Sequence, residues 1–208
     1  MTAAAPAVDR VLQALAPALP EAPRERLRAS VLELTRFGAH TDLTGVRDPL
    51  ELAAVALADA LVLARHRSLL GAPVWEVGAG GASLLVPLAL VDPTVEGVLV
   101  EPRQKRATFL RLCLGRFGLA PRLRVSQTRV EPEAPPRAVC QGAVSRAVYA
   151  PEQWLPLARA LLRPAGAVVV LTTEAPSVPE GWTALAQERY ALPGTGAPRV
   201  ATWLTAAP

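Results

Sequence analysis

Residues 74–91 read VWEVGAGGASLLVPLALV, and this stretch decides the fold. The run VWEV is typical of a buried strand, and LLVPLALV is typical of a buried helix. Glycines cluster between the two runs, where glycine permits positive φ and close approach of the backbone to a ligand. In a doubly wound sheet, ligands bind beyond the carboxyl ends of the strands. The pattern therefore predicts a ligand site at this bend, and its candidate contacts are Glu76, Gly78, Gly80 and Gly81.

After Pro73 the chain alternates between short β-like runs and helical ones. This alternation predicts an α/β fold, a parallel sheet with helices on both faces. The tail holds two more β-like runs around the turn PGTGAP, which predict an antiparallel hairpin at the sheet edge. The expected strands are 74–78, 95–101, 122–127, 138–145, 165–173, 182–192 and 199–207, and the expected helices are 83–91, 103–118 and 151–162.

Residues 7–66 have the apolar spacing of helices. Two helices are expected before a polar loop at 38–46, and a third begins after Asp48, with Pro49 in its first turn. We interpret residues 1–70 as an N-terminal helical extension and residues 71–208 as the core that follows it.

Composition limits the class of protein. The 208 residues are 51% hydrophobic, enough for one large domain with a substantial core. Arginine carries nearly all of the positive charge, because Lys105 is the single lysine among 22 basic residues and the net charge is +4. Arginine forks bind phosphate in a bidentate way, but a GC-rich genome also enriches arginine. Both explanations stay open.

Several classes of protein are disfavoured. Cys113 and Cys140 form no CxxC pair, so we expect reduced core thiols in a cytoplasmic protein. The start MTAAAPAVDR lacks a secretory pattern, and Asp59 interrupts the longest apolar run, so no membrane span is expected. His40 and His66 are the two histidines and have no companion ligands at metal spacing, so we expect no metal site and no hydrolase triad.

An acid at the end of the second predicted strand narrows the class of ligand. Glu101 ends VEGVLVE, where nucleotide folds place a carboxylate that accepts hydrogen bonds from ribose hydroxyls. Ser83 stands where a dinucleotide GxGxxG motif requires glycine, and no Walker lysine is present. S-adenosylmethionine has a ribose and no phosphate, so this combination favours it as the cofactor.

Several stretches together resemble the GidB-like ribosomal small-subunit methyltransferase G family, over about residues 30–172. Its members transfer a methyl group from S-adenosylmethionine to N7 of a guanine in small-subunit (16S) ribosomal RNA. The stretches are DLTGVRDPLEL with ADALVL, EVGAGG, VEPRQKRATFLR, RVE and SRAV. The resemblance implies a class I methyltransferase (Rossmann-like) fold, and it adds Pro102, Arg129, Val130, Glu131 and Ser145 to the cofactor-binding residues.

The first motif departs from the family pattern DVGSGAGFPG. Ala82 stands in place of a glycine, and SLLV replaces the GFPG turn. If residue 82 needs positive φ, its methyl group costs about 1–2 kcal/mol. Asp42, Ala56 and Gln141 also depart from the family's usual residues. Two alternatives therefore remain: a paralogue that methylates another RNA or a small molecule, and a non-catalytic RNA-binding or regulatory module that has lost the cofactor.

The chemistry of guanine N7 needs few side chains. N7 has an in-plane lone pair and no proton, so methylation requires alignment and no general base. The base must leave its stack before it enters a pocket. Arg146, after the fourth strand, is the candidate catalytic residue, and it could meet an RNA phosphate or the guanine O6. Lys105 and Arg106 are candidate contacts to the RNA backbone. The expected partner is ribosomal RNA or the ribosomal subunit, bound by a monomer.

Overall fold

The computed structural model describes residues 4–38 and 43–207. Three helices come first, as the apolar spacing predicted: α1 (Ala4–Leu15), α2 (Glu21–Gly38) and α3 (Pro49–Arg65). The Asp48 side chain accepts hydrogen bonds from the backbone N–H groups of Leu50 and Glu51, and Pro49 occupies the first turn. These are the expected signals for a helix start. A short 3₁₀ helix, η1 (Arg67–Leu69), leads into the sheet.

Seven strands form one sheet in the order β3-β2-β1-β4-β5-β7-β6. The first five are parallel, and β7 runs antiparallel to both of its neighbours. The strand order reverses at β1, which pairs with β2 on one side and β4 on the other. Ligands bind at such a switch point. The strands are β1 (Val74–Val77), β2 (Gly97–Val100), β3 (Leu123–Ser126), β4 (Cys140–Ser145), β5 (Leu162–Thr172), β6 (Trp182–Ala191) and β7 (Pro198–Ala206).

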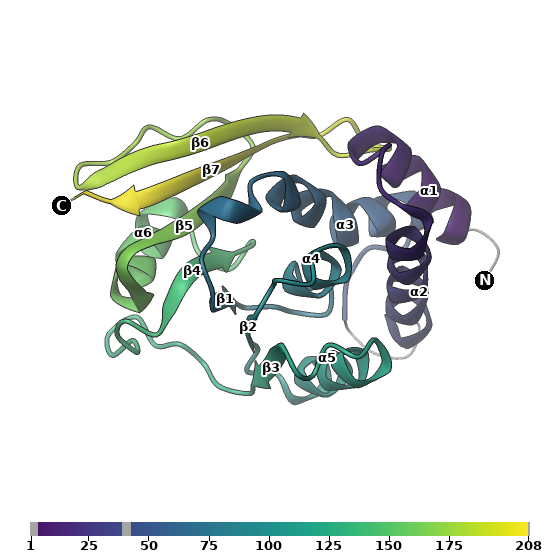
Figure 1. The fold of residues 1–208 in the computed structure, drawn as a ribbon, viewed down its shortest axis with the longest axis horizontal. Coiled ribbons are helices and arrows are strands. Elements are labelled where there is room, and N and C mark those ends of the chain that lie inside the picture. The colour runs from purple at the N-terminus through teal and green to yellow at the C-terminus, as the bar shows by residue number, and fades with distance from the viewer. Residues whose placement is uncertain (1–3, 39–42, 208) are drawn as a thin grey trace.

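Helices cover both faces of the sheet, as predicted, but unequally. Figure 1 shows α1 to α5 on one side, including α4 (Leu85–Val91) and α5 (Gln104–Arg116), and α6 (Pro151–Leu161) on the other. The connections 127–139 and 173–181 contain no helix, because proline-rich sequence fills both. The second face is therefore covered by α6 and irregular chain.

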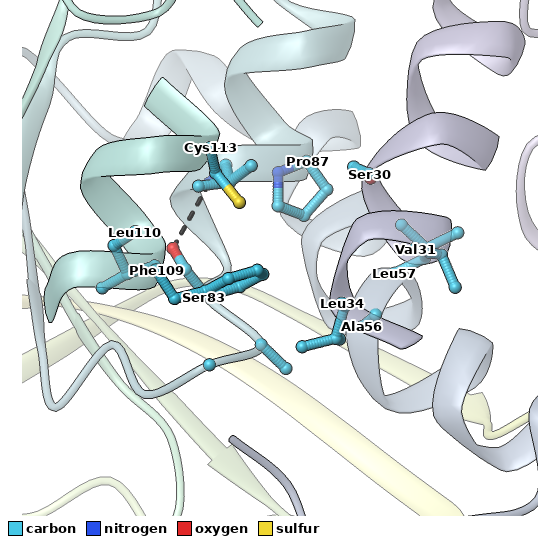
Figure 2. Close-up of a pocket in the computed structure, with 13 residues that line it drawn as sticks. Ser30, Val31, Leu34, Ala56, Leu57, Ser83, Pro87, Phe109, Leu110 and Cys113 are labelled. Carbon is cyan, nitrogen blue, oxygen red and sulfur yellow. Dashed lines mark hydrogen bonds between the residues drawn. The ribbon is translucent and has the colours of Figure 1, made fainter. Parts of the chain in front are cut away.

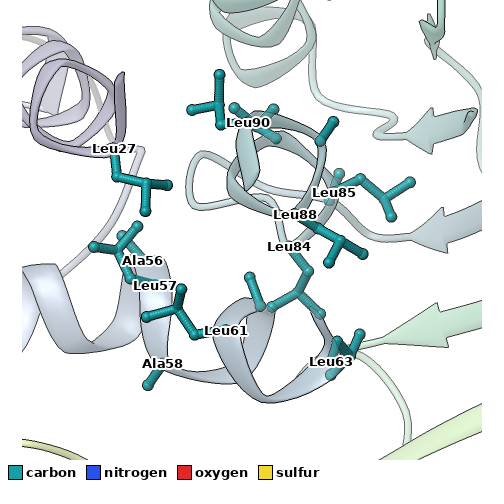
Figure 3. Packing of buried hydrophobic residues seen from close by; sticks show 14 of the residues in the cluster. Leu27, Ala56, Leu57, Ala58, Leu61, Leu63, Leu84, Leu85, Leu88 and Leu90 are labelled. Atoms are coloured by element: carbon teal, nitrogen blue, oxygen red, sulfur yellow. The ribbon is translucent and has the colours of Figure 1, made fainter. Parts of the chain in front are cut away.

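The N-terminal helices share one hydrophobic core with the sheet. Leu27 of α2, Leu57 and Leu61 of α3 and Leu88 of α4 belong to the same buried cluster (Figure 3). The same cluster reaches Val144 in β4. Truncation of a fully buried leucine such as Leu57 to alanine costs about 2–5 kcal/mol. The division of the chain at residue 70 remains a prediction about its organisation.

The predicted hairpin at the sheet edge is confirmed. β6 and β7 pair antiparallel, with Tyr190 opposite Arg199, and the register shifts between Ala184 and Ala186. β7 also pairs with β5, so the hairpin extends the parallel sheet, as the long arrows in Figure 1 show. Across the described residues no helix is long and apolar enough to cross a bilayer.

Candidate active site

A cavity of about 310 Å³ lies at the carboxyl ends of β1 and β2 and beside the loop after β4. This is the edge of the sheet where the strand order reverses. Its polar and apolar walls come from the four loops that follow β1, β2, β3 and β4. The lining residues are Val77, Gly78, Val100, Glu101, Pro102, Arg103, Arg106, Thr128, Arg129, Val130, Ala147, Val148 and Tyr149.

Glu101 is the buried acid of this cavity. Its residue is 3% exposed, and its two carboxylate oxygens accept hydrogen bonds from different backbone N–H groups. One oxygen accepts from Gly80 at 2.9 Å and the other from Arg103 at 2.8 Å. A carboxylate has about four lone-pair sites, so these two bonds leave acceptor capacity on each oxygen. Glu101 can therefore hold the bend and still accept a ligand's hydroxyl groups.

The three glycines of the bend serve different purposes. Gly78 and Gly80 have φ values of 77° and 62°, which favour glycine. A Cβ on Gly78 would lie 2.3 Å from a methyl carbon of Val148, whereas a Cβ on Gly80 would meet nothing closer than 3.9 Å. A Cβ on Gly81 would lie 2.8 Å from the Leu43 carbonyl oxygen. Gly80 is thus favoured by its φ and borders open space, and Gly81 allows the loop before α3 to pack closely.

Glu76 turns into the protein. Its buried carboxylate accepts hydrogen bonds from the Ser83 hydroxyl, the Leu84 N–H at 2.7 Å and the Leu85 N–H at 3.1 Å. These bonds close the turn after β1 and satisfy donors at the start of α4. Burial raises the pKa of Glu76, while its hydrogen bonds and the charge of Arg146 act against that rise. Glu76 does not line the cavity, so its contribution to a ligand site is through the shape of the turn.

Ala82 carries no backbone strain. Among the described residues, non-glycine residues with positive φ occur at 138, 147 and 165, and residue 82 is not one of them. The methyl group of Ala82 packs against the core, and its carbonyl accepts a hydrogen bond from Arg146. The substitution of the family's glycine therefore does not impose the cost that a left-handed residue 82 would impose.

Beneath this turn lies a small, largely apolar cavity of about 30 Å³ between α2, α3 and α5 (Figure 2). Ser83 accepts a hydrogen bond from the Val86 N–H there, and the thiol of Cys113 lies at its wall. Burial raises the pKa of Cys113 to about 12. The cavity has room for about one water molecule and is too small for a nucleoside. Cys113 is the inward core residue that the helix pattern predicted.

Arg146 lies at another large cavity, of about 270 Å³, next to the 310 Å³ cavity beyond β1 and β2. We call the 310 Å³ cavity the first cavity and the 270 Å³ cavity the second. Its guanidinium donates to the carbonyls of Val55 and Ala82 and to Asp59 Oδ2 at 3.1 Å. Ala147 lines both cavities and has a φ of 56°, a conformation that alanine rarely adopts and that often marks functional sites. The second cavity is lined by Val55, Asp59, Arg146, Ala147, Leu171, Thr172, Thr173, Leu192 and Arg199.

The structure brings together part of the predicted cofactor set. Gly78, Glu101, Pro102, Arg129 and Val130 line the first cavity, and so does Arg106, a predicted RNA contact. The other predicted residues lie around it. Glu76, Gly80 and Gly81 form the bend, Ser145 donates to the Val77 carbonyl at 2.9 Å, Glu131 is exposed 3.9 Å from Arg129, and Lys105 is exposed on α5.

Both cavities are also lined by residues that the sequence did not predict. Arg103, Thr128 and Tyr149 adjoin motifs that were recognised, so proximity to those motifs was the available signal. Arg199 had no such signal, because it lies in the hairpin, far along the chain from every glycine or acid motif. Its guanidinium donates to the carbonyl of Pro198 at 3.3 Å.

His66 lines neither the first nor the second cavity. His66 Nε2 lies 2.8 Å from Glu188 Oε2, and the His66 ring packs against Trp203 at a tilt of 46°, with ring centroids 4.5 Å apart. Over the ranges that the structure describes, no group of three His, Cys, Asp or Glu side chains could hold a metal ion. His40 and Asp42 lie outside the described residues.

Comparison with known proteins decides the family. Residues 24–182 match the sequence profile of GidB, described as rRNA small subunit methyltransferase G. The chain belongs to the GidB family. Its GidB relatives include ribosomal RNA small subunit methyltransferase G of Bordetella avium, 28% identical over 97% of this chain and 93% of the relative. The protein of the same name from Nitratidesulfovibrio vulgaris is 34% identical over 78% of this chain and 77% of the relative.

Solved structures show the same fold at low identity. A Burkholderia thailandensis 1,6-didemethyltoxoflavin-N1-methyltransferase with bound S-adenosylhomocysteine matches with a TM-score of 0.57 and 17% identity, over 86% of this chain and 89% of that one. A Geobacter sulfurreducens SAM-dependent methyltransferase, also in complex with S-adenosylhomocysteine, matches with a TM-score of 0.54 and 13% identity, over 85% and 98%. The predicted class I methyltransferase fold and the GidB resemblance are confirmed.

Proposed function

We propose that this GidB-family chain transfers a methyl group from S-adenosylmethionine to N7 of a guanine in small-subunit ribosomal RNA. The observation that carries the proposal is the buried carboxylate of Glu101, which faces a cavity at the switch of strand order with acceptor capacity to spare. The names of the relatives, ribosomal RNA small subunit methyltransferase G, supply the substrate class. We place this activity in the cytoplasm and assign it to a monomer.

The residues of the first cavity fit a nucleoside cofactor. The free lone pairs of Glu101 suit two ribose hydroxyls, and the side chains of Pro102 and Val130 offer apolar walls to an adenine ring. Open space over Gly80 allows a ligand to approach the bend. Arg129, Glu131 and Ser145 surround this site. S-adenosylmethionine would supply a methyl group made electrophilic by its sulfonium, and the protein supplies position.

The second cavity is the proposed acceptor site. It shares Ala147 with the first, so an acceptor there lies next to the cofactor site. Arg146 and Arg199 give it two guanidinium groups, which suit RNA phosphates or the O6 of guanine. N7 needs no proton removed, so no general base is required. Lys105 and Arg106 on α5 are the proposed contacts to the RNA backbone.

Methyl transfer to defined RNA tests the proposal. The protein is incubated with radiolabelled S-adenosylmethionine and either naked 16S ribosomal RNA or small ribosomal subunits. A 7-methylguanosine residue carries a ring cation, so borohydride reduction followed by aniline should cleave the RNA at one guanine. Label at another atom, or label in a small molecule only, would favour the paralogue. Absence of S-adenosylhomocysteine binding would favour the non-catalytic module.

A further inference from the structure

A buried carboxylate in the wall of the proposed acceptor site joins three elements. Asp59 in α3 is 4% exposed. Its Oδ2 accepts a hydrogen bond from Arg146 at 3.1 Å, and its Oδ1 accepts one from the Tyr190 hydroxyl at 2.6 Å. Arg146 follows β4, and Tyr190 belongs to the edge strand β6. The three side chains therefore tie the helix, the sheet edge and the loop after β4 to one carboxylate.

A buried carboxylate at residue 59 carries a desolvation cost that folding by itself does not explain. It is the single charge in the apolar stretch 52–64 of α3, and the neighbours Ala58 and Ala60 are fully buried. A buried ion pair adds little stability over apolar residues of similar volume, because desolvation offsets the attraction. An apolar side chain at residue 59 would thus serve a purely structural helix as well. The carboxylate is better explained by the side chains that donate hydrogen bonds to it.

What it holds is the guanidinium of Arg146. Bonds to Asp59, Val55 and Ala82 engage three of its five N–H donors and fix the plane of the group. The guanidinium still lines the second cavity, with its side chain 21% exposed. The Tyr190 hydroxyl occupies the other oxygen of Asp59, which prevents the carboxylate from rotating.

We infer that Asp59 and Tyr190 are positioning residues of the acceptor site, which act through Arg146 by fixing the orientation of its guanidinium toward RNA. The inference rests on the proposed function, because it requires Arg146 to contact the acceptor. Although Asp59 lines the same cavity, it is 4% exposed, and we assign contact with substrate to neither Asp59 nor Tyr190. Their effect on RNA should therefore disappear when the Arg146 guanidinium is absent.

A double-mutant cycle tests this dependence. Tyr190→Phe removes only the hydroxyl group, and Asp59→Asn gives a second, isosteric variant. Each is made alone and together with Arg146→Ala, and affinities for 16S ribosomal RNA and for S-adenosylhomocysteine are measured, with melting points to confirm folding. Thr205→Val is the matched control, because it removes a hydroxyl that donates to the Gly166 carbonyl in the neighbouring strand.

We expect Tyr190→Phe to weaken RNA binding by about fivefold in the wild-type background and to have no effect in the Arg146→Ala background. Affinity for S-adenosylhomocysteine should stay unchanged, as should RNA binding by Thr205→Val. Equal losses in both backgrounds would overturn the positioning role while leaving the proposed function intact. Full RNA affinity in Arg146→Ala would overturn the positioning role as well, because Arg146 would then make no contact with the acceptor. Failure of the wild type to bind S-adenosylhomocysteine would overturn the proposed function itself.

Discussion

The backbone N–H of Gly80 donates a hydrogen bond of 2.9 Å to Glu101, and this bond joins the glycine bend after β1 to the acid after β2. The second oxygen of the same carboxylate holds the Arg103 N–H at the start of α5. The acid is therefore fixed by the chain before any ligand arrives. Preorganisation of this kind reduces the entropy that binding must offset.

Glu101→Ala should lower affinity for S-adenosylhomocysteine by at least about tenfold, because hydrogen bonds to a charged group contribute roughly 1.5–3 kcal/mol each. Isothermal titration calorimetry measures the change. Glu96→Ala is the matched control, since Glu96 is an exposed acid at the opposite end of β2. Because Glu101 also holds Gly80 and Arg103, melting points must accompany the titration. Equal affinities for the wild type and Glu101→Ala would contradict the ribose-binding role.

The altered glycine turn should still support cofactor binding. A ligand at 100 times its Kd stabilises the fold by about 2.7 kcal/mol. Each kcal/mol raises the Tm of a chain of this length by roughly 2–4 °C, so we expect a shift of about 5–10 °C in saturating S-adenosylmethionine and none with NAD or ATP. Thermal denaturation measures the shift. No shift at millimolar S-adenosylmethionine would count against the methyltransferase assignment.

Two opposite substitutions test the bend itself. Ala82→Gly should leave cofactor affinity unchanged, because Ala82 has no positive φ to relieve. Gly80→Ala should destabilise the bend by about 1–2 kcal/mol, because Gly80 has a φ of 62°. Calorimetric titration and Tm compare the pair. Tighter binding by Ala82→Gly would show that residue 82 strains the site.

Arg199→Ala should weaken RNA binding and leave S-adenosylhomocysteine binding intact, because Arg199 lines the second cavity and not the first. If its guanidinium contacts a phosphate, the dependence of log affinity on log salt should become less steep by about 0.7 on single-stranded RNA. Filter binding across a salt series measures this slope. Arg189→Ala is the control, since Arg189 is an exposed neighbour on the same hairpin. An unchanged slope for Arg199→Ala would exclude the phosphate contact.

The two thiols should be inert at neutral pH. Burial raises the pKa of Cys113 and of Cys140 to about 12 each, so at pH 8 their thiolate fraction is about a thousandfold below that of an exposed cysteine. Chemical labelling of the two thiols should be slow in the native protein and fast in urea. The thiols have a pKa of 9.0 in the unfolded chain and about 12 in the folded one, so the unfolded chain loses these protons first. The stability that burial of the neutral thiols contributes is therefore present below about pH 9 and is lost as pH rises toward 12. Rapid labelling of the native protein at pH 8 would contradict this burial.

Sequence by itself determined the architecture and brought the glycine bend and Glu101 to one edge of the sheet. Alternating apolar periods set the strands and helices, because burial of one face depends on local spacing. The bend and Glu101 were found because strand ends in a parallel sheet meet at one edge, whatever the packing above them. The inward stripe of α5, with Leu110, Cys113 and Leu114, follows from the same periodicity.

Tertiary structure alone decided which side chains face the cavities and which face the protein interior. Glu76 turns inward because the serine and the N–H groups of its own loop occupy its carboxylate. Arg146 meets Asp59 and Tyr190 because α3 and the edge hairpin pack against the loop after β4. Contacts between residues 59, 146 and 190 depend on how whole elements dock, and no local period or spacing in the chain encodes that docking.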